Sequence, residues 1–89
     1  MLFEWDANKR EINRERHRLD LTDGQMLFDG RPVFSYPSPR HGEQRVVTVG
    51  LIGGKFYAVV WTERSDATRL ILFRRPRIGE ERAYRARFG

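Results

Sequence analysis

The pattern of apolar and polar residues in the second half of the chain predicts three successive β-strands. Apolar residues rich in Val, Ile and Leu dominate 44–51, 55–63 and 67–74. The short turns at Gly53-Gly54 and Ser65-Asp66 have the length of tight hairpins, so we expect an antiparallel meander. Because both faces of these strands are largely apolar, we expect the sheet to be covered on both sides over part of its area.

The first third of the chain predicts two helices. Asp6 precedes a stretch that contains no Gly or Pro, which predicts a helix over residues 7–18 with Asp6 as its N-cap. The apolar face of this helix is thin, so few side chains would dock it. Asp20 is placed to cap a second, shorter helix over residues 21–28, which Gly30 would end.

The remaining segments complete an α+β fold. Residues 33–36 read as a strand, and the Pro-rich loop that follows indicates an edge position. Residues 78–87 read as a terminal helix, whereas residues 2–5 form either a short strand or a packed arm. We therefore expect one domain over residues 1–89, with two N-terminal helices, an antiparallel sheet of about four strands and a C-terminal helix.

The excess positive charge lies near the C-terminus. The chain has 17 Lys and Arg residues against 12 Asp and Glu, and fifteen of the cations are Arg. Residues 1–68 carry ten cations and ten anions, whereas residues 69–89 carry seven cations and two anions. Such a patch suits nucleic acid or an acidic protein partner, and a solvated helix face explains it equally well.

The composition excludes several classes of function. An 89-residue chain has room for one modest core, so we expect any chemistry to occur at a shallow site. The absence of cysteine excludes disulfides, thiolate metal sites and Cys nucleophiles, and two histidines are too few for a His-based zinc site. No apolar run approaches the roughly 18 residues of a membrane span. We expect a cytoplasmic protein with no cofactor, no metal and no membrane partner.

The hairpin between the last two strands carries the densest polar cluster. If its loop has two residues, Thr62 lies opposite Arg69, and strict alternation then puts Arg64 with Arg69 on one face and Glu63 with Arg74 on the other. A three-residue loop would instead pair Glu63 with Arg69. The cluster is either a solvated, ion-paired hairpin tip or a site where arginines bind phosphate and Glu63 accepts a proton.

Two further groups of residues are candidates for RNA chemistry. Lys9, Asn13 and His17 follow one another at four-residue intervals and share one face of the first helix. His17 is either a structural residue, an acid or base for RNA cleavage, or a cation that binds phosphate. Basic and aromatic residues are interleaved near the C-terminus, in Phe73-Arg74-Arg75 and then in Arg82, Tyr84, Arg85, Arg87 and Phe88. This mixture is typical of single-stranded RNA recognition, although core packing explains the same aromatics.

A set of short motifs is spaced along nearly the whole chain. Its members are Phe3-Glu4-Trp5-Asp6, Lys9, Asn13, Arg16-His17, Phe28-Asp29, Glu43-Gln44-Arg45, Val49-Gly50, Thr62-Glu63-Arg64, Arg69-Leu70-Ile71, Arg74-Arg75, Glu80 and Tyr84. In order and spacing this set resembles the BrnT family of toxins. The opening Phe-Glu-Trp-Asp and the Thr-Glu-Arg of the hairpin are fairly specific in combination.

The resemblance implies a RelE/ParE-like fold and the toxin of a type II toxin-antitoxin system. Such a toxin would be a metal-independent ribonuclease that cleaves RNA and inhibits translation, with the 2′-hydroxyl of the RNA as the attacking group. A BrnA-like antitoxin would neutralise it, and promoter DNA would be bound only through the antitoxin complex. A non-catalytic basic module that binds an acidic protein partner or nucleic acid is the alternative from another class.

The resemblance also assigns roles to particular positions. The catalytic candidates are Glu63, Arg64, Arg74 and His17, and the RNA-binding candidates are Lys9, Arg45, Arg69 and Arg75. The chain departs from the family pattern at two helix ends. Arg18 stands where the family usually has Gly, so we expect the first helix to continue further. Pro76-Arg77 replaces the usual Ala-Thr, which removes the expected cap of the last helix.

Overall fold

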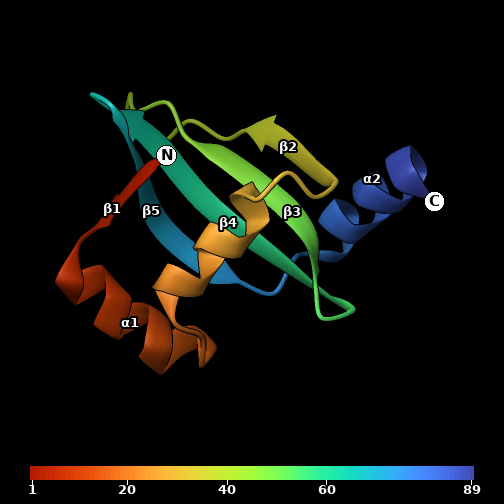
Figure 1. Cartoon of the computed structure of the whole chain (residues 1–89), viewed down its shortest axis with the longest axis horizontal. Helices are drawn as coiled ribbons and strands as arrows, with labels where there is room; N and C mark the ends of the chain where they lie inside the picture. Colours follow the sequence, from red (N-terminus) through yellow and green to blue (C-terminus); the bar gives the residue numbers. More distant parts are fainter.

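The computed structural model describes residues 1–89 and shows a five-stranded sheet with helical segments on both faces (Figure 1). The sheet order is β1-β5-β4-β3-β2. The elements are β1 (Leu2–Trp5), α1 (Ala7–His17), the 3₁₀ helix η1 (Leu21–Phe28), β2 (Val33–Pro37), β3 (Val46–Ile52), β4 (Lys55–Arg64), β5 (Ala67–Arg74) and α2 (Ile78–Phe88). None of the helices has the length and apolar character needed to cross a membrane.

The sheet is mixed, and it has one strand more than expected. Strands β2 to β5 pair antiparallel, as the apolar pattern predicted. Strand β1 adds a fifth strand, which runs parallel to β5 with Leu2 opposite Ala67 and Trp5 opposite Leu70. The expectation of an antiparallel sheet of about four strands is therefore wrong in both respects. Four residues are too short a stretch for the sequence pattern to distinguish a strand from a packed arm.

The hairpin between β4 and β5 has the two-residue loop. Thr62 lies opposite Arg69 and Glu63 lies opposite Thr68, so the alternative that pairs Glu63 with Arg69 is wrong. Ser65 adopts a positive φ of 54°, which the tight turn requires.

A β-bulge in the same strand pair changes the faces on which side chains lie. Ile71 has no partner in β4, because its two neighbours pair with consecutive β4 residues. The extra residue shifts the alternation of β5 by one position. Arg74 therefore lies on the face of Arg69, and the expectation that it shares a face with Glu63 is wrong. The segment 70–72 is apolar throughout, so the sequence pattern carries no sign of the bulge.

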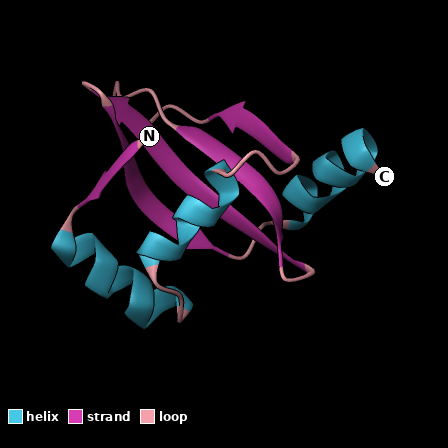
Figure 2. Cartoon of the chain, in the orientation of Figure 1, coloured by secondary structure: helices cyan, strands magenta, loops and turns pink.

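Helices lie on both faces of the sheet (Figure 2). An apolar cluster on each face holds them to the sheet. On the first face, called the η1 face, Leu21 and Leu27 of η1 pack against Val59, Leu70 and Phe73. On the second face, called the α2 face, Tyr84 of α2 packs against Val47, Val49, Phe56 and Ala58. The expectation of a sheet covered on both sides over part of its area is confirmed.

Close packing explains the glycine in η1. A Cβ atom at Gly24 would lie 2.8 Å from a Cγ atom of Val59, so only glycine lets η1 approach the sheet this closely. The boundaries predicted for this helix agree with the structure, and its 3₁₀ form is the part that the sequence did not show.

Helix α1 is docked by a polar residue. Asn13 is 1% exposed, and its amide nitrogen donates to the carbonyl oxygens of Phe73 and Leu19, both at 2.9 Å. Its amide oxygen accepts from the backbone N–H of Phe73 at 2.8 Å. Because β1 ends opposite Leu70, this side chain occupies the place that a longer β1 would have taken beside Phe73.

Candidate nucleic-acid interface

The α2 face of the sheet is open beside the part that α2 covers. There it forms a pocket of about 150 Å³ whose charged lining residues are four arginines. The lining consists of Tyr36, Ser38, Arg40, Arg45, Val47, Val60, Ile71, Leu72, Arg74 and Arg77. We call this pocket the arginine groove. No acidic residue lines it, but Arg45 and Arg74 are paired with Glu43 and Glu80, so the unpaired positive charge of the groove comes from Arg40 and Arg77.

Arg74 is held in place by a buried ion pair with α2. Its guanidinium donates to the two carboxylate oxygens of Glu80 at 2.7 and 2.9 Å, and the Tyr36 hydroxyl donates to the same carboxylate. The Arg74 and Glu80 side chains are 11% and 6% exposed. The β2 strand, the β5 strand and the last helix therefore meet at one carboxylate.

The charge state of this cluster follows from its hydrogen bonds. Burial of Glu80 opposes its ionisation, but the hydrogen bonds from Arg74, Tyr36 and the Arg77 amide outweigh burial and lower its pKa to about 2. Burial raises the pKa of Tyr36, and the adjacent Glu80 carboxylate raises it further. At neutral pH the cluster is therefore a guanidinium, a carboxylate and a protonated phenol.

Glu80 also caps α2, which begins at Ile78 although the usual capping residue is missing. The carboxylate of Glu80 accepts the backbone N–H of Arg77 at 2.7 Å, as the third residue of a helix does in a capping box. The Arg77 side chain forms no ion pair and lines the arginine groove.

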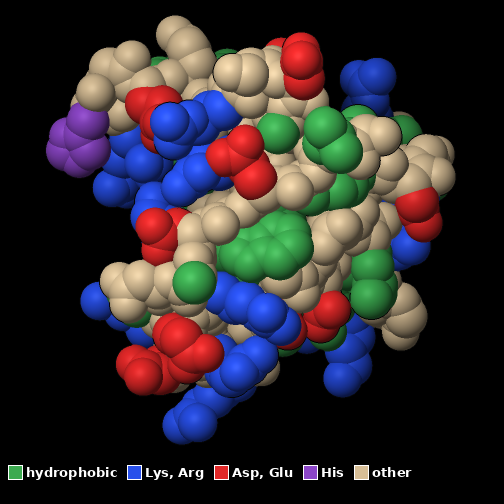
Figure 3. Space-filling view, turned by 60° about the vertical axis from the view of Figure 1, so that its left-hand side comes forward, with side chains coloured by type: hydrophobic (Ala, Val, Ile, Leu, Met, Phe, Trp, Pro, Cys, Tyr) green, Lys and Arg blue, Asp and Glu red, His purple; other side chains and the backbone are tan.

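A second basic pocket adjoins the arginine groove. It has a volume of about 320 Å³ and is lined by Lys9, Arg16 and His17 of α1, together with Ile12, Asn13, Ile71 and Leu72. Ile71 and Leu72 of β5 line both pockets, so the two are neighbours at this strand. This second pocket, called the α1 pocket, also has no acidic residue in its lining. Figure 3 shows one face of the molecule, on which Lys and Arg side chains form several groups with Asp and Glu side chains between them, around a central apolar patch.

Most of the catalytic and RNA-binding candidates lie on the α2 face or in the α1 pocket. Arg64 and Arg69 share the α2 face with Arg74, and Arg69 pairs with Glu4 at 2.5 Å. Arg45 pairs with Glu43 at 2.7 Å. This hydrogen bond lowers the pKa of Glu43, and the positive charges of Lys9 and Arg64 act in the same direction. Glu43 is thus an anion among three cations.

The comparison with known families agrees with this basic surface. The family model described as "Ribonuclease toxin, BrnT, of type II toxin-antitoxin system" matches residues 5–80. The chain belongs to the BrnT family. No curated protein sequence matches it. The matched range contains all of α1 and every residue that lines the arginine groove, so the basic surface of this BrnT protein lies within the part that defines the family.

Two of the predicted site residues lie apart from the others in this BrnT chain. Glu63 points to the η1 face, where it lines a pocket with Trp61 and Thr68. Arg75 lies over the ring of Tyr57, 4.9 Å from its centroid, and lines neither basic pocket. The structure thus brings Arg64, Arg69 and Arg74 to one face and places Glu63 across the sheet from them.

Sequence reasoning missed three residues of the arginine groove. Tyr36 was assigned only to a strand, Arg40 to a loop, and Arg77 only to a departure from the family pattern. The excess of positive charge from residue 69 onward was a signal for Arg77, whereas nothing in the sequence places Arg40 beside Arg74.

No three His, Asp or Glu side chains are grouped so that they could hold a metal ion.

Proposed function

We propose that this BrnT-family toxin is an endoribonuclease that binds RNA along the arginine groove and the α1 pocket. The observation that carries the proposal is that four arginines, and no carboxylate, line the arginine groove. A groove lined by cations suits a single-stranded phosphate backbone. Arg64 and Arg69 lie farther along the same face, toward the hairpin between β4 and β5.

Arginines in the groove have two different roles in this proposal. Arg40 and Arg77 form no ion pair, so their guanidinium groups are free to take a phosphate in a bidentate contact. Arg74 is fixed by Glu80, so its position does not have to be ordered when RNA binds. A fixed donor beside the scissile phosphate would stabilise the charge that develops in the transition state.

The reaction we propose uses the 2′-hydroxyl of the RNA as nucleophile. The 2′-oxygen attacks the adjacent phosphorus and gives its proton to a base, while the 5′-oxygen leaves and takes a proton from an acid. The products are a 2′,3′-cyclic phosphate and a 5′-hydroxyl end. His17 is the imidazole of the α1 pocket, and histidine is the side chain that most often acts as a general acid or base in catalysis.

The cellular role that we propose follows from RNA cleavage. Loss of intact RNA would inhibit translation in the cytoplasm, and a BrnA-like antitoxin would neutralise the toxin. Promoter DNA would be bound by the complex through the antitoxin.

The proposal is tested with purified protein and a labelled single-stranded RNA. We expect the double variant Arg40→Gln with Arg77→Gln to bind RNA roughly tenfold more weakly or worse, because two phosphate contacts are lost. Arg82→Gln is the matched control, because Arg82 is exposed on α2 and lines neither basic pocket. Equal losses for both variants would contradict the groove assignment.

The products of the same reaction test the chemistry. Fragments that carry 2′,3′-cyclic phosphate and 5′-hydroxyl ends, detected by mass spectrometry, are the expected result. Firm binding of RNA without any cleavage would instead identify a non-catalytic basic binding module.

A further inference from the structure

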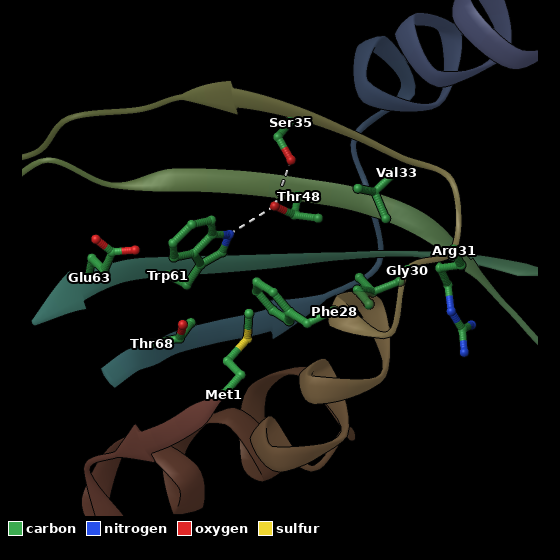
Figure 4. Close-up of a pocket in the computed structure, with 11 residues that line it drawn as sticks. Met1, Phe28, Gly30, Arg31, Val33, Ser35, Thr48, Trp61, Glu63 and Thr68 are labelled. Carbon is green, nitrogen blue, oxygen red and sulfur yellow. Dashed lines mark hydrogen bonds between the residues drawn. The ribbon is translucent and has the colours of Figure 1, made fainter. Parts of the chain in front are cut away.

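The η1 face carries a second groove that the proposed RNA site does not use. It has a volume of about 320 Å³ and lies between the end of η1 and strands β2 to β5 (Figure 4). Its apolar lining comprises Met1, Leu27, Phe28, Val33 and Trp61. The rings of Phe28 and Trp61 meet edge to face with their centroids 5.4 Å apart. We call this the tryptophan groove.

The polar groups along the tryptophan groove are nearly all engaged within the chain. The indole N–H of Trp61 donates to the Thr48 hydroxyl at 2.8 Å, and Thr48 is also bonded to Ser35. Arg31 donates to Asp29 and to the backbone carbonyl of residue 51. The guanidinium that lines this groove is thus already paired.

Glu63 is the charged lining group that has no partner. Its side chain is exposed, forms no ion pair and lies beyond Trp61 at one end of the groove in Figure 4. An anion at this place repels phosphate, so the groove does not suit RNA. It suits an apolar segment of a protein that brings a cation to Glu63, since exposed aromatic and Met side chains are typical of protein interfaces.

We infer that the antitoxin docks in the tryptophan groove through an apolar segment that carries a Lys or Arg opposite Glu63. The inference rests on membership of a type II toxin family, which implies an antitoxin partner, and not on the proposed RNA chemistry. A second copy of this chain is a poorer occupant, because each copy has a net charge of +5. The sheet separates this groove from the arginine groove, so the antitoxin is held by a face that RNA does not occupy.

The inference is tested by measuring the affinity for the purified protein encoded by the reading frame adjacent to the toxin gene. We expect Glu63→Lys to weaken this affinity by at least tenfold, because it replaces an attraction with a repulsion. Asp66→Lys is the matched control, because Asp66 is an exposed carboxylate of the same hairpin that does not line the groove. It should change the affinity less than twofold. Equal effects of the two variants, or none from Glu63→Lys, would overturn the inference.

Hydrogen exchange on the unsubstituted complex gives a second reading that needs no variant. Phe28, Gly30, Arg31 and Val33 line the tryptophan groove and neither basic pocket, and we expect the antitoxin to slow the exchange of their amides. Slower exchange confined to residues 38–45 and to α2 would place the antitoxin on the arginine groove instead.

The rate of RNA cleavage without antitoxin is measured on the same protein preparations. Cleavage lost in Glu63→Lys, with antitoxin affinity intact, would assign Glu63 to the reaction and reject its docking role.

Discussion

Glu80 is a buried carboxylate that links three parts of the molecule. Its carboxylate accepts from the Arg74 guanidinium, the Tyr36 hydroxyl and the Arg77 amide. Removing one partner of such a buried pair leaves an uncompensated charge, which is far more costly than the net stabilisation from the intact pair. Arg74 is therefore a structural residue as well as a candidate for phosphate binding, and its substitution would affect both stability and RNA cleavage.

Glu80→Gln should make the stability of the protein less dependent on pH. Folding lowers the pKa of Glu80 to about 2, so its stabilisation is complete above the unfolded value near 4.5 and is lost as the pH falls through about 2. We expect the variant to be less stable by about 3 kcal/mol at pH 7. Urea unfolding should show this difference shrinking between pH 4.5 and pH 2. A difference that stays constant with pH would contradict the ionised pair.

Arg18→Gly should stabilise the protein. Arg18 ends α1 with a φ of 58°, a left-handed conformation that costs a residue with a Cβ atom free energy but suits glycine. Allowing for the greater freedom of glycine in the unfolded chain, we expect a gain of about 0.5–1 kcal/mol in thermal or urea unfolding. Arg16→Gly, inside the helix, should instead cost about 1 kcal/mol. No gain from Arg18→Gly would mean that the strain is relieved elsewhere.

At the scale of elements, the sequence predicts features that depend on neighbouring residues, such as helix starts and strands. It does not predict contacts between residues that are far apart in the chain. The Asp6 cap predicts where α1 begins. The expectation that α1 continues further is wrong, because Arg18 adopts a left-handed conformation and the helix ends at His17. How α1 docks depends on Asn13 meeting Phe73, sixty residues away. The side of the sheet on which Arg74 lies likewise depends on the β-bulge at Ile71. The residues around this bulge are all apolar, so the sequence pattern does not reveal it. Caps, turns and strand periods could be read from the sequence, whereas these pairings could not.

Asn13→Ala tests the polar docking of α1. The substitution leaves the N–H and the carbonyl of Phe73 without partners in a buried position, so we expect a loss of about 3 kcal/mol in the free energy of unfolding. Asn8→Ala is the control on the same helix, because the exposed Asn8 side chain makes no hydrogen bond. It should change stability by less than about 0.5 kcal/mol. Similar losses for the two variants would show that α1 is held mainly by other contacts.

In the whole molecule, the two faces of one sheet have different chemistry. The α2 face carries a groove lined by four arginines, and the η1 face carries an aromatic groove with an unpaired carboxylate. Because neighbouring residues of a strand point to opposite faces, Glu63 and Arg64 belong to different surfaces although they are adjacent in the chain. If the two proposed sites are correct, we expect separate substitutions to alter RNA cleavage and antitoxin binding.

The central claim is that RNA is cleaved at the basic side of the sheet. Comparing the rates of RNA cleavage by His17→Ala and His41→Ala tests this claim most directly. His17 lines the α1 pocket, whereas His41 lies in an exposed loop and lines none of the basic pockets. With purified protein and RNA in single-turnover conditions, we expect His17→Ala to lower the rate about 100-fold or more, and His41→Ala to leave it unchanged. Equal rates for the two variants and the unsubstituted protein would contradict a reaction at the basic face of the sheet.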